Sequence, residues 1–268
     1  MLINPKSLKE KLSHKNTILL CCLLKPVNSL QPAMDTPEFI SGSKIFDVDD
    51  FSVSGSAFPH TLLSLKDFEK KARDLGIDDD SSIFIYDCVG IYSSPRVWFN
   101  FTLMGCKNVS VLDGGLPGWK NNGFPVFKTF ENVTTFGSFT AHQISNMLAS
   151  KEEVLNATIN PNCVVIDVRS SDRFFGKVPE PRQGLRSGHI PGSINIPFSQ
   201  FIDGISFRSK KDLMNIFKEA GCDENKELIF SCGSGVTACI GYFAANLCGY
   251  KNTKLYDGSW AEWGSIGS

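Results

Sequence analysis

Hydrophobic residues gather in short continuous runs that alternate with segments of helical spacing. Apolar runs at 17–24 and 163–168 each follow a helical pattern, at 6–12 and 141–155 respectively. Continuous apolar runs of this length are typical of strands that are covered on both faces. Because strands and helices alternate, the pattern predicts parallel α/β sheets with right-handed crossovers.

The chain repeats this pattern once. The segment MGCKNVSVLDGGLPGW, which ends at Trp119, recurs as LCGYKNTKLYDGSWAEW, which ends at Trp263. One unbroken offset of 144 residues relates Gly105 to Gly249 and Trp119 to Trp263, with further identities between them. A period this long that occurs twice indicates duplication of a domain and not a solenoid.

We therefore predict two tandem α/β domains, each a mostly parallel sheet flanked by helices, at 1–130 and 139–268. The join is expected within 124–138, where periodicity lapses among proline, threonine, asparagine and glycine. Two domains of ~130 residues also suit the length of the chain, since most domains have ~100–150 residues.

Composition indicates an ordinary globular protein, with 42% hydrophobic residues and a net charge of −1. It disfavours intrinsic disorder and nucleic-acid binding, which needs a basic excess. Nine cysteines without a CxxC pair disfavour a disulfide framework and a structural zinc site, so we expect no metal and no cofactor.

No apolar run approaches the ~20 residues that cross a bilayer, so no membrane partner is expected. The run at 18–24 ends at Lys25-Pro26 and fits a buried strand better than the apolar region of a signal peptide. Reduced thiols and the absence of a recognisable targeting pattern favour the cytoplasm.

Cys232 follows an apolar strand at 227–231 and opens the loop CGSGVT, which leads into an apolar helix at 238–247. Open α/β sheets bind ligands at the carboxyl ends of their strands. Gly233 and Gly235 allow backbone N–H groups to turn toward the sulfur, where they and the helix N-terminus would stabilise a thiolate. The position predicts a nucleophile. One more buried thiol is the alternative, whereas a P-loop is disfavoured because GxxxxGK[ST] is absent.

Further motifs accompany CGSGVTA: SSPRVW from Ser93, EPRQG from Glu180, GHIPGSINIPF from Gly188 and YDGSWAEW from Tyr256. Together they resemble the tandem-domain rhodaneses, and among these the 3-mercaptopyruvate sulfurtransferases. The resemblance extends over essentially the whole chain. It implies two rhodanese-like domains with the C-terminal one active. It also implies a persulfide on Cys232: the thiolate takes the sulfur of 3-mercaptopyruvate, pyruvate departs, and a thiol or cyanide accepts the sulfur.

The resemblance also assigns substrate binding. Arg173 and Arg182 match the two arginines that hold the carboxylate and carbonyl of mercaptopyruvate, and a planar guanidinium can bind a carboxylate through two hydrogen bonds. Arg169 and Arg186 are nearby alternatives, of which Arg169 is expected to anchor the loop through ion pairs. Backbone N–H groups of the loop are expected to complete the site; they belong to Gly233, Ser234, Gly235, Val236 and Thr237.

The loop itself bears on the sulfur donor. Similar rhodaneses that prefer thiosulfate carry basic residues in this loop, whereas Gly233, Ser234 and Gly235 are neutral. A donor whose carboxylate is bound outside the loop therefore fits better, with thiosulfate as the first alternative. Related phosphatases have a seven-residue loop, so the six residues here disfavour phosphatase activity.

A proton relay is also implied by the resemblance, through Ser234, His60 and Asp49. Asp49 and His60 are eleven residues apart, as in the family. The acid would orient the imidazole, which would polarise the hydroxyl. Since His60 comes from the N-terminal half, the site is expected where the two domains meet. The segment FSVSGSAFPHTL departs from the family pattern and leaves the loop conformation open.

The repeat places Cys88 opposite Cys232. Bulky neighbours and the adjacent Asp87 oppose a thiolate there, so we expect an inactive remnant. An alternative from another class is a non-catalytic rhodanese-like binding module, which the intact nucleophile, arginines and relay disfavour. Thioredoxin and small thiols are the acceptors that the resemblance suggests, and the sequence does not rank them.

Overall fold

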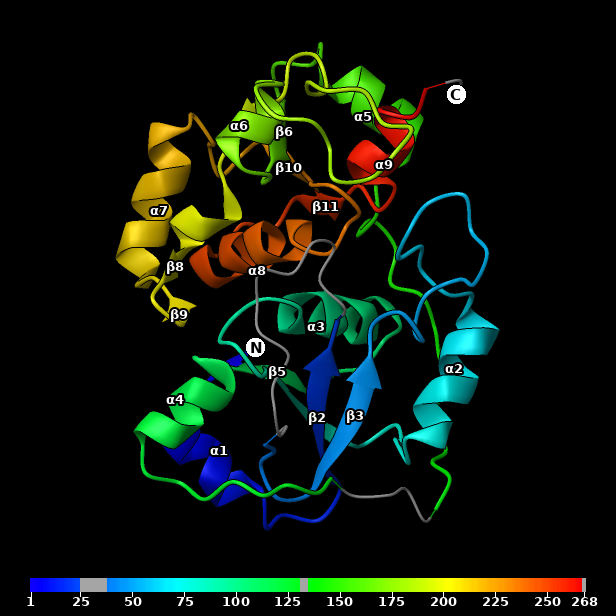
Figure 1. The fold of residues 1–268 in the computed structure, drawn as a ribbon, viewed down its shortest axis with the longest axis vertical. Coiled ribbons are helices and arrows are strands. Elements are labelled where there is room, and N and C mark those ends of the chain that lie inside the picture. Colours follow the sequence, from blue (N-terminus) through cyan, green and yellow to red (C-terminus); the bar gives the residue numbers. More distant parts are fainter. Residues whose placement is uncertain (25–37, 131–134, 267–268) are drawn as a thin grey trace. The chain divides into compact units, whose positions relative to one another are not determined.

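The computed structural model describes residues 1–24, 38–130 and 135–266. It divides into two compact units. The first comprises Met1–Ser54, Leu62–Ile144 and Gly204–Ser206, and the second comprises Gly55–Thr61, Ser145–Asp203 and Phe207–Ser268. Each unit contains one parallel sheet with helices packed around it (Figure 1). The predicted parallel α/β architecture is therefore confirmed.

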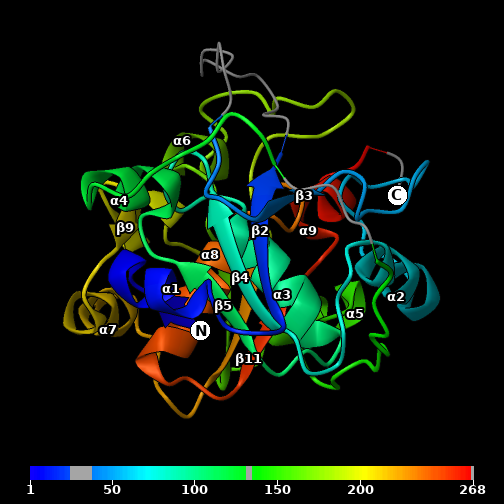
Figure 2. The same cartoon turned by 90° about the horizontal axis from the view of Figure 1, so that it is seen from below.

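The first unit has a five-stranded sheet in the order β1-β5-β4-β2-β3, in which every pairing is parallel. Its strands are β1 Leu2–Ile3, β2 Thr17–Leu23, β3 Ser43–Asp47, β4 Ser82–Asp87 and β5 Val109–Leu112. Its helices are α1 Pro5–Lys11, α2 Leu65–Asp74, α3 Ser94–Leu103 and α4 Gly115–Asn121. In the view of Figure 2 the neighbouring strands β2, β4 and β5 can be followed side by side.

The second unit has a four-stranded parallel sheet in the order β11-β10-β6-β7. Its strands are β6 Cys163–Asp167, β7 Ile194–Asn195, β10 Glu227–Ser231 and β11 Thr253–Leu255. Its helices are α5 Lys151–Ala157, α6 Ser171–Phe174, α7 Lys210–Glu219, α8 Ala238–Cys248 and α9 Ser259–Trp263. The 3₁₀ helix η1 Phe198–Phe201 and the short strands β8 Ile202–Asp203 and β9 Ser206–Phe207 lie between β7 and α7.

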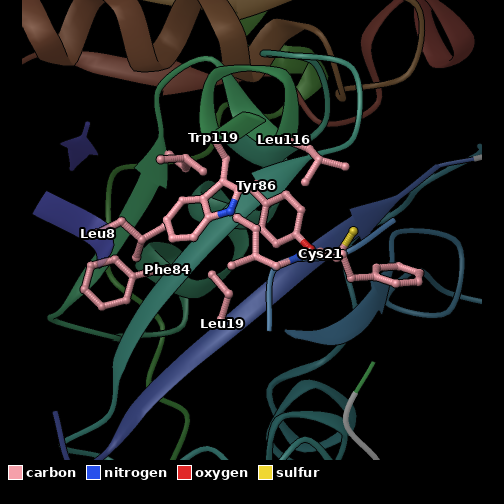
Figure 3. Close-up of a cluster of buried hydrophobic side chains, with 10 residues drawn as sticks. Leu8, Leu19, Cys21, Phe84, Tyr86, Leu116 and Trp119 are labelled. Carbon is pink, nitrogen blue, oxygen red and sulfur yellow. Dashed lines mark hydrogen bonds between the residues drawn. The ribbon is translucent and has the colours of Figure 1, made fainter. Parts of the chain in front are cut away.

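Continuous apolar strands build both cores, as the hydrophobic pattern predicts. In the first unit, β2 and β4 contribute side chains to a buried cluster that α1 and α4 cover, and Figure 3 labels Leu8, Leu19, Cys21, Phe84, Tyr86, Leu116 and Trp119. In the second unit, Val165 of β6 and Ile229 of β10 pack with Trp260 of α9. In each unit the centre of the sheet is therefore rigid, and loops at its carboxyl edge start from fixed positions.

The helix predicted over 141–155 is wrong over 141–150. Only α5 forms, and it begins where Ser150 and Glu153 make reciprocal capping hydrogen bonds. Before it, the backbone N–H of Ala149 donates to the carbonyl of Leu255, and the N–H of Leu255 donates to the carbonyl of Met147. Met147 and Ala149 are thus buried beside β11 without forming a helix, and this pairing outweighs the helical spacing of the segment.

Within the part of the chain that the structure describes, no helix is long and apolar enough to cross a bilayer.

Candidate active site

Cys232 directly follows β10, the strand that pairs with β6 on one side and β11 on the other. Its side chain is buried, with 2% of its surface exposed. The loop then reaches α8 through Gly235, whose φ of +77° is the left-handed conformation that glycine adopts without strain. The structure therefore places this thiol at the carboxyl edge of the sheet and before a helix, as predicted.

Ser259 ties the Cys232 loop to α9. Its Oγ accepts hydrogen bonds from the backbone N–H groups of Cys232 and Gly235, each at 3.1 Å, and donates to the carbonyl of Tyr256 at 2.8 Å. The N–H groups of Trp260 and Ala261 in turn donate to carbonyls of the loop. The sequence predicted that the N–H of Gly235 faces the substrate; in the structure it donates to Ser259 instead.

Sequence reasoning did not assign this role to Ser259. The motif YDGSWAEW, quoted only as part of the family resemblance, contains this serine directly before Trp260. Ser259 has a φ of +50°, which is uncommon for a residue with a side chain. Ser259 is the first residue of α9, and from there its hydroxyl reaches the Cys232 loop.

We expect Ser259→Ala to lower both stability and turnover. Two buried N–H groups would lose their acceptor, at a cost of about 1–3 kcal/mol. Thermal unfolding followed by circular dichroism and steady-state kcat measure the two effects. Ser193→Ala is a matched control, since the Ser193 hydroxyl donates only to the carbonyl of Ile190 in a turn. Equal melting temperatures and kcat values for Ser259→Ala and Ser193→Ala would contradict this assignment.

Arg173 and Arg182 both lie beside the Cys232 loop. A methyl group placed on Gly233 would be 3.0 Å from Nη2 of Arg173 and 3.7 Å from Nη1 of Arg182. The missing side chain at Gly233 is therefore what leaves room for two guanidinium groups over the loop. The structure thus brings together both arginines that the sequence singled out.

Glu180 positions one of these arginines. Its carboxylate accepts from Nη2 of Arg173 at 2.6 Å and from Nε at 3.1 Å. Burial alone would lower the pKa of Arg173, but hydrogen bonding to Glu180 and the charges of Glu180, Cys232 and Asp167 raise it above its ordinary value. The guanidinium therefore stays charged beside the thiol.

Arg169 is an anchor, in agreement with the expectation from the sequence. It is fully buried and pairs with Asp167 at 2.6 Å and with Glu180 at 2.9 Å. Its guanidinium also lies over the ring of Trp260, 4.5 Å from the centroid. Sequence reasoning quoted Glu180 only as part of EPRQG and missed that it joins the buried Arg169 to Arg173.

His60 contacts the loop. Its Nδ1 lies 2.9 Å from Oγ of Ser234, and the segment Gly55–Thr61 groups with the second unit. His60 has a φ of +59°, so its backbone holds a conformation that residues with side chains rarely adopt.

The remaining predicted site residues are divided between the two units. Asp49 lies in an exposed turn after β3, in the first unit. Val236 is buried and Thr237 immediately precedes α8.

In the first unit, the loop that corresponds to the Cys232 loop begins at Cys88, and its backbone N–H groups bind the Asp87 carboxylate. Asp87 ends β4 and accepts hydrogen bonds from the backbone N–H groups of Tyr92, Ser93 and Ser94. Burial raises the pKa of Asp87, and hydrogen bonds from the Ser93 and Ser94 hydroxyls, together with the backbone N–H groups of Tyr92 and Ser94, oppose the rise. N–H groups that a ligand could use are therefore already bound in this loop, which favours the expectation that Cys88 is not a second sulfur-transfer site.

No cluster of three or more His, Cys, Asp or Glu side chains in the described ranges could hold a metal ion. The grouping at the carboxyl edge of the second sheet is instead a buried thiol, two guanidinium groups and a His–Ser pair. Such a set can bind an anionic substrate and attack it with sulfur.

Comparisons with known proteins agree with this geometry. The model of the rhodanese-like domain matches residues 38–122 and 150–266. A 3-mercaptopyruvate sulfurtransferase from Mus musculus is 38% identical, covering 84% of this chain and 76% of the relative. A thiosulfate sulfurtransferase from Rattus norvegicus is 36% identical over the same shares.

The crystal structure of SseA from Escherichia coli, described as a 3-mercaptopyruvate sulfotransferase with the rhodanese fold, superimposes with a TM-score of 0.84. It is 28% identical, and the match covers 97% of this chain and 98% of that one. Both halves of the chain and their order are included in these matches. The chain belongs to the tandem-domain rhodanese family, the family of the 3-mercaptopyruvate sulfurtransferases.

Proposed function

We propose that this protein is a sulfurtransferase that moves the sulfur of 3-mercaptopyruvate through a persulfide on Cys232 to a thiol acceptor or cyanide and releases pyruvate. The observation that carries the proposal is the placement of Arg173 and Arg182 over Gly233, next to the thiol. Their charge suits the carboxylate of an α-keto acid, and the loop beneath them is neutral.

In the first step the Cys232 thiolate attacks the substrate sulfur while the sulfur–carbon bond breaks. The electron pair of that bond goes to the carbon, and the resulting enolate takes up a proton to become pyruvate. The two guanidinium groups hold the carboxylate and the carbonyl, where the negative charge of the enolate develops. In the second step an acceptor thiolate attacks the outer sulfur of the persulfide, and Cys232 leaves as a thiolate.

The proton exchanged in the first step requires a group beside the reacting sulfur. We assign this role to Ser234 and His60, which are within hydrogen-bonding distance of each other. We assign Asp49 as the third member of the proposed relay, the acid that would orient His60. Gly235, Val236 and Thr237 complete the loop around the sulfur.

Thiosulfate is the second candidate donor, because a thiosulfate sulfurtransferase is nearly as similar to this chain as the mercaptopyruvate enzymes are. Its sulfonate could bind the same two arginines. As acceptors we propose thioredoxin or small thiols, and as the compartment the cytoplasm, because the nine cysteines are unbridged thiols.

The donor is tested by mass spectrometry of the reduced protein after single exposures to 3-mercaptopyruvate and to thiosulfate. We expect a gain of one sulfur, ~32 Da, at far lower concentrations of 3-mercaptopyruvate. Preferential gain from thiosulfate would overturn the donor and keep the nucleophile. No gain from either compound would favour the non-catalytic binding module.

Arg182→Lys should raise KM for 3-mercaptopyruvate by about 10-fold with a smaller change in kcat. Lysine keeps the charge but lacks the planar pair of donors that a carboxylate binds. Arg186→Lys is the matched control, because Arg186 donates to the carbonyl of Trp263. An unchanged KM in Arg182→Lys, measured by pyruvate release, would remove Arg182 from the substrate site.

A further inference from the structure

Two cysteines of the first unit are in direct contact. Cys21 lies in β2 and Cys88 directly follows β4, and their sulfur atoms are 3.4 Å apart although 67 residues separate them in the chain. Both are thiols in the structure. This pair has no part in the proposed sulfur transfer.

The register of the sheet explains the contact. Cys21 pairs with Tyr86 across β2 and β4, and Cys88 lies two residues beyond Tyr86. Because side chains two residues apart point to the same face of a strand, Tyr86 and Cys88 both face the side where Cys21 lies. Figure 3 shows Cys21 and Tyr86 together in the buried cluster on this face, and Cys88 packs against the same cluster.

The two thiols differ in accessibility. Cys21 is fully buried, whereas Cys88 is partly exposed and the next residue, Val89, has 45% of its surface exposed. A small solute can therefore reach Cys88 from outside, whereas Cys21 lies on the core side of Cys88.

A disulfide between the two residues requires a sulfur–sulfur distance near 2.05 Å. Cys88 begins a loop, where its backbone is outside the hydrogen-bond ladder of the sheet, so the closer approach needs only a local adjustment.

The two thiols also differ in acidity. The hydrogen-bonded contact with Cys21 lowers the pKa of Cys88, against the effects of burial and of Asp87. The same contact, together with burial, raises the pKa of Cys21. Elsewhere burial raises the pKa of Cys106 to about 12 and those of Cys222 and Cys248 to about 11. Cys88 is thus favoured as the attacking thiolate over these other thiols.

We propose that Cys21 and Cys88 form a dithiol site that hydroperoxides oxidise reversibly to a disulfide. The Cys88 thiolate attacks one peroxide oxygen, the O–O bond breaks, and the leaving oxygen takes a proton, which leaves Cys88 as a sulfenic acid. Cys21 then loses its proton and attacks the Cys88 sulfur. The S–O bond breaks, hydroxide takes that proton and leaves as water. One peroxide accepts the two electrons that the two thiols lose, and a thiol reductant reverses the reaction.

The test uses the full-length Cys232→Ser protein, so that the predicted nucleophile of the second unit does not consume the oxidant. Reduced protein is treated with one equivalent of hydrogen peroxide and analysed by intact mass and by peptide mapping without reduction. We expect a loss of ~2 Da, linked peptides that contain Cys21 and Cys88, and recovery with dithiothreitol. The oxidised protein should also melt several degrees higher, because the bridge closes a long loop.

Variants distinguish the role of Cys88, which reacts with the peroxide, from that of Cys21, which then forms the bridge. In Cys21→Ser, whose hydroxyl can still donate to the Cys88 sulfur but cannot bridge to it, Cys88 should remain a sulfenic acid that dimedone traps. Cys88→Ser should show neither the loss of mass nor dimedone labelling in this unit. Cys106→Ser is the control and should form the bridge as the parent does. Retention of both thiols in the parent protein, or a bridge between any other pair, would overturn the proposal, and circular dichroism of each variant verifies that it is folded.

Discussion

Replacing Cys232 with serine is expected to reduce pyruvate release from 3-mercaptopyruvate by roughly 10³-fold or more, because the covalent route through the persulfide is lost. Serine is nearly the same size, so the buried position should still be filled and the loop should keep its hydrogen bonds to Ser259. The protein should fold normally while its mass no longer rises by one sulfur after exposure to the donor.

Cys88→Ser is the matched control at the corresponding position of the first unit. It should retain turnover and the mass gain of the parent protein, because Asp87 already uses the N–H groups of that loop. Persulfide in the Cys232→Ser protein that disappears in the double variant would instead identify Cys88 as a second sulfur carrier.

The second large effect is expected on stability. Glu180→Gln removes the charge that pairs with Arg169 and Arg173, and only 1% of the Glu180 side chain is exposed. Breaking a buried ion pair from one side typically costs about 3–5 kcal/mol, because the partner charge stays buried. We expect a loss of that order in the free energy of unfolding, measured by urea denaturation. KM for 3-mercaptopyruvate should rise as well, because Arg173 loses its orienting partner.

Glu227→Gln is the control, because it removes a paired carboxylate that is partly exposed instead of buried. Glu227 pairs with Lys254 at 3.1 Å in the same unit, but its side chain is 31% exposed. Exposed pairs contribute about 0–1 kcal/mol, so this variant should remain close to the parent in stability and activity. Similar stability losses in both variants would show that burial of the Glu180 pair has no special effect.

The duplication illustrates how one loop position can take different chemistry. Ser231 precedes Cys232 in the second unit, whereas Asp87 precedes Cys88 in the first. The carboxylate binds the N–H groups of its own loop, and Cys88 instead contacts Cys21. The two loops of the duplication thus differ in what binds their backbone N–H groups: Asp87 in the first unit, and Ser259 at two positions in the second.

The order of strands and helices could be predicted from the sequence because each buried strand is a continuous apolar run. The strand predicted at 17–24 is β2, the run at 163–168 is β6, and the helix predicted at 238–247 is α8. The repeat indicated that the architecture occurs twice. The cysteine of interest was also identifiable, since two glycines and a following helix are local features of the chain.

Tertiary structure decided which distant side chains meet. Local spacing could not show that Gly233 makes room for two arginines, that Ser259 holds the Cys232 loop or that Glu180 joins Arg169 to Arg173, because each contact depends on how separate segments fold together. The same holds for the extended segment before α5, whose helical spacing is overridden by pairing with the end of β11. The sequence by itself determined the order of most elements and singled out Cys232 as the predicted nucleophile, whereas packing between elements determined what surrounds that cysteine.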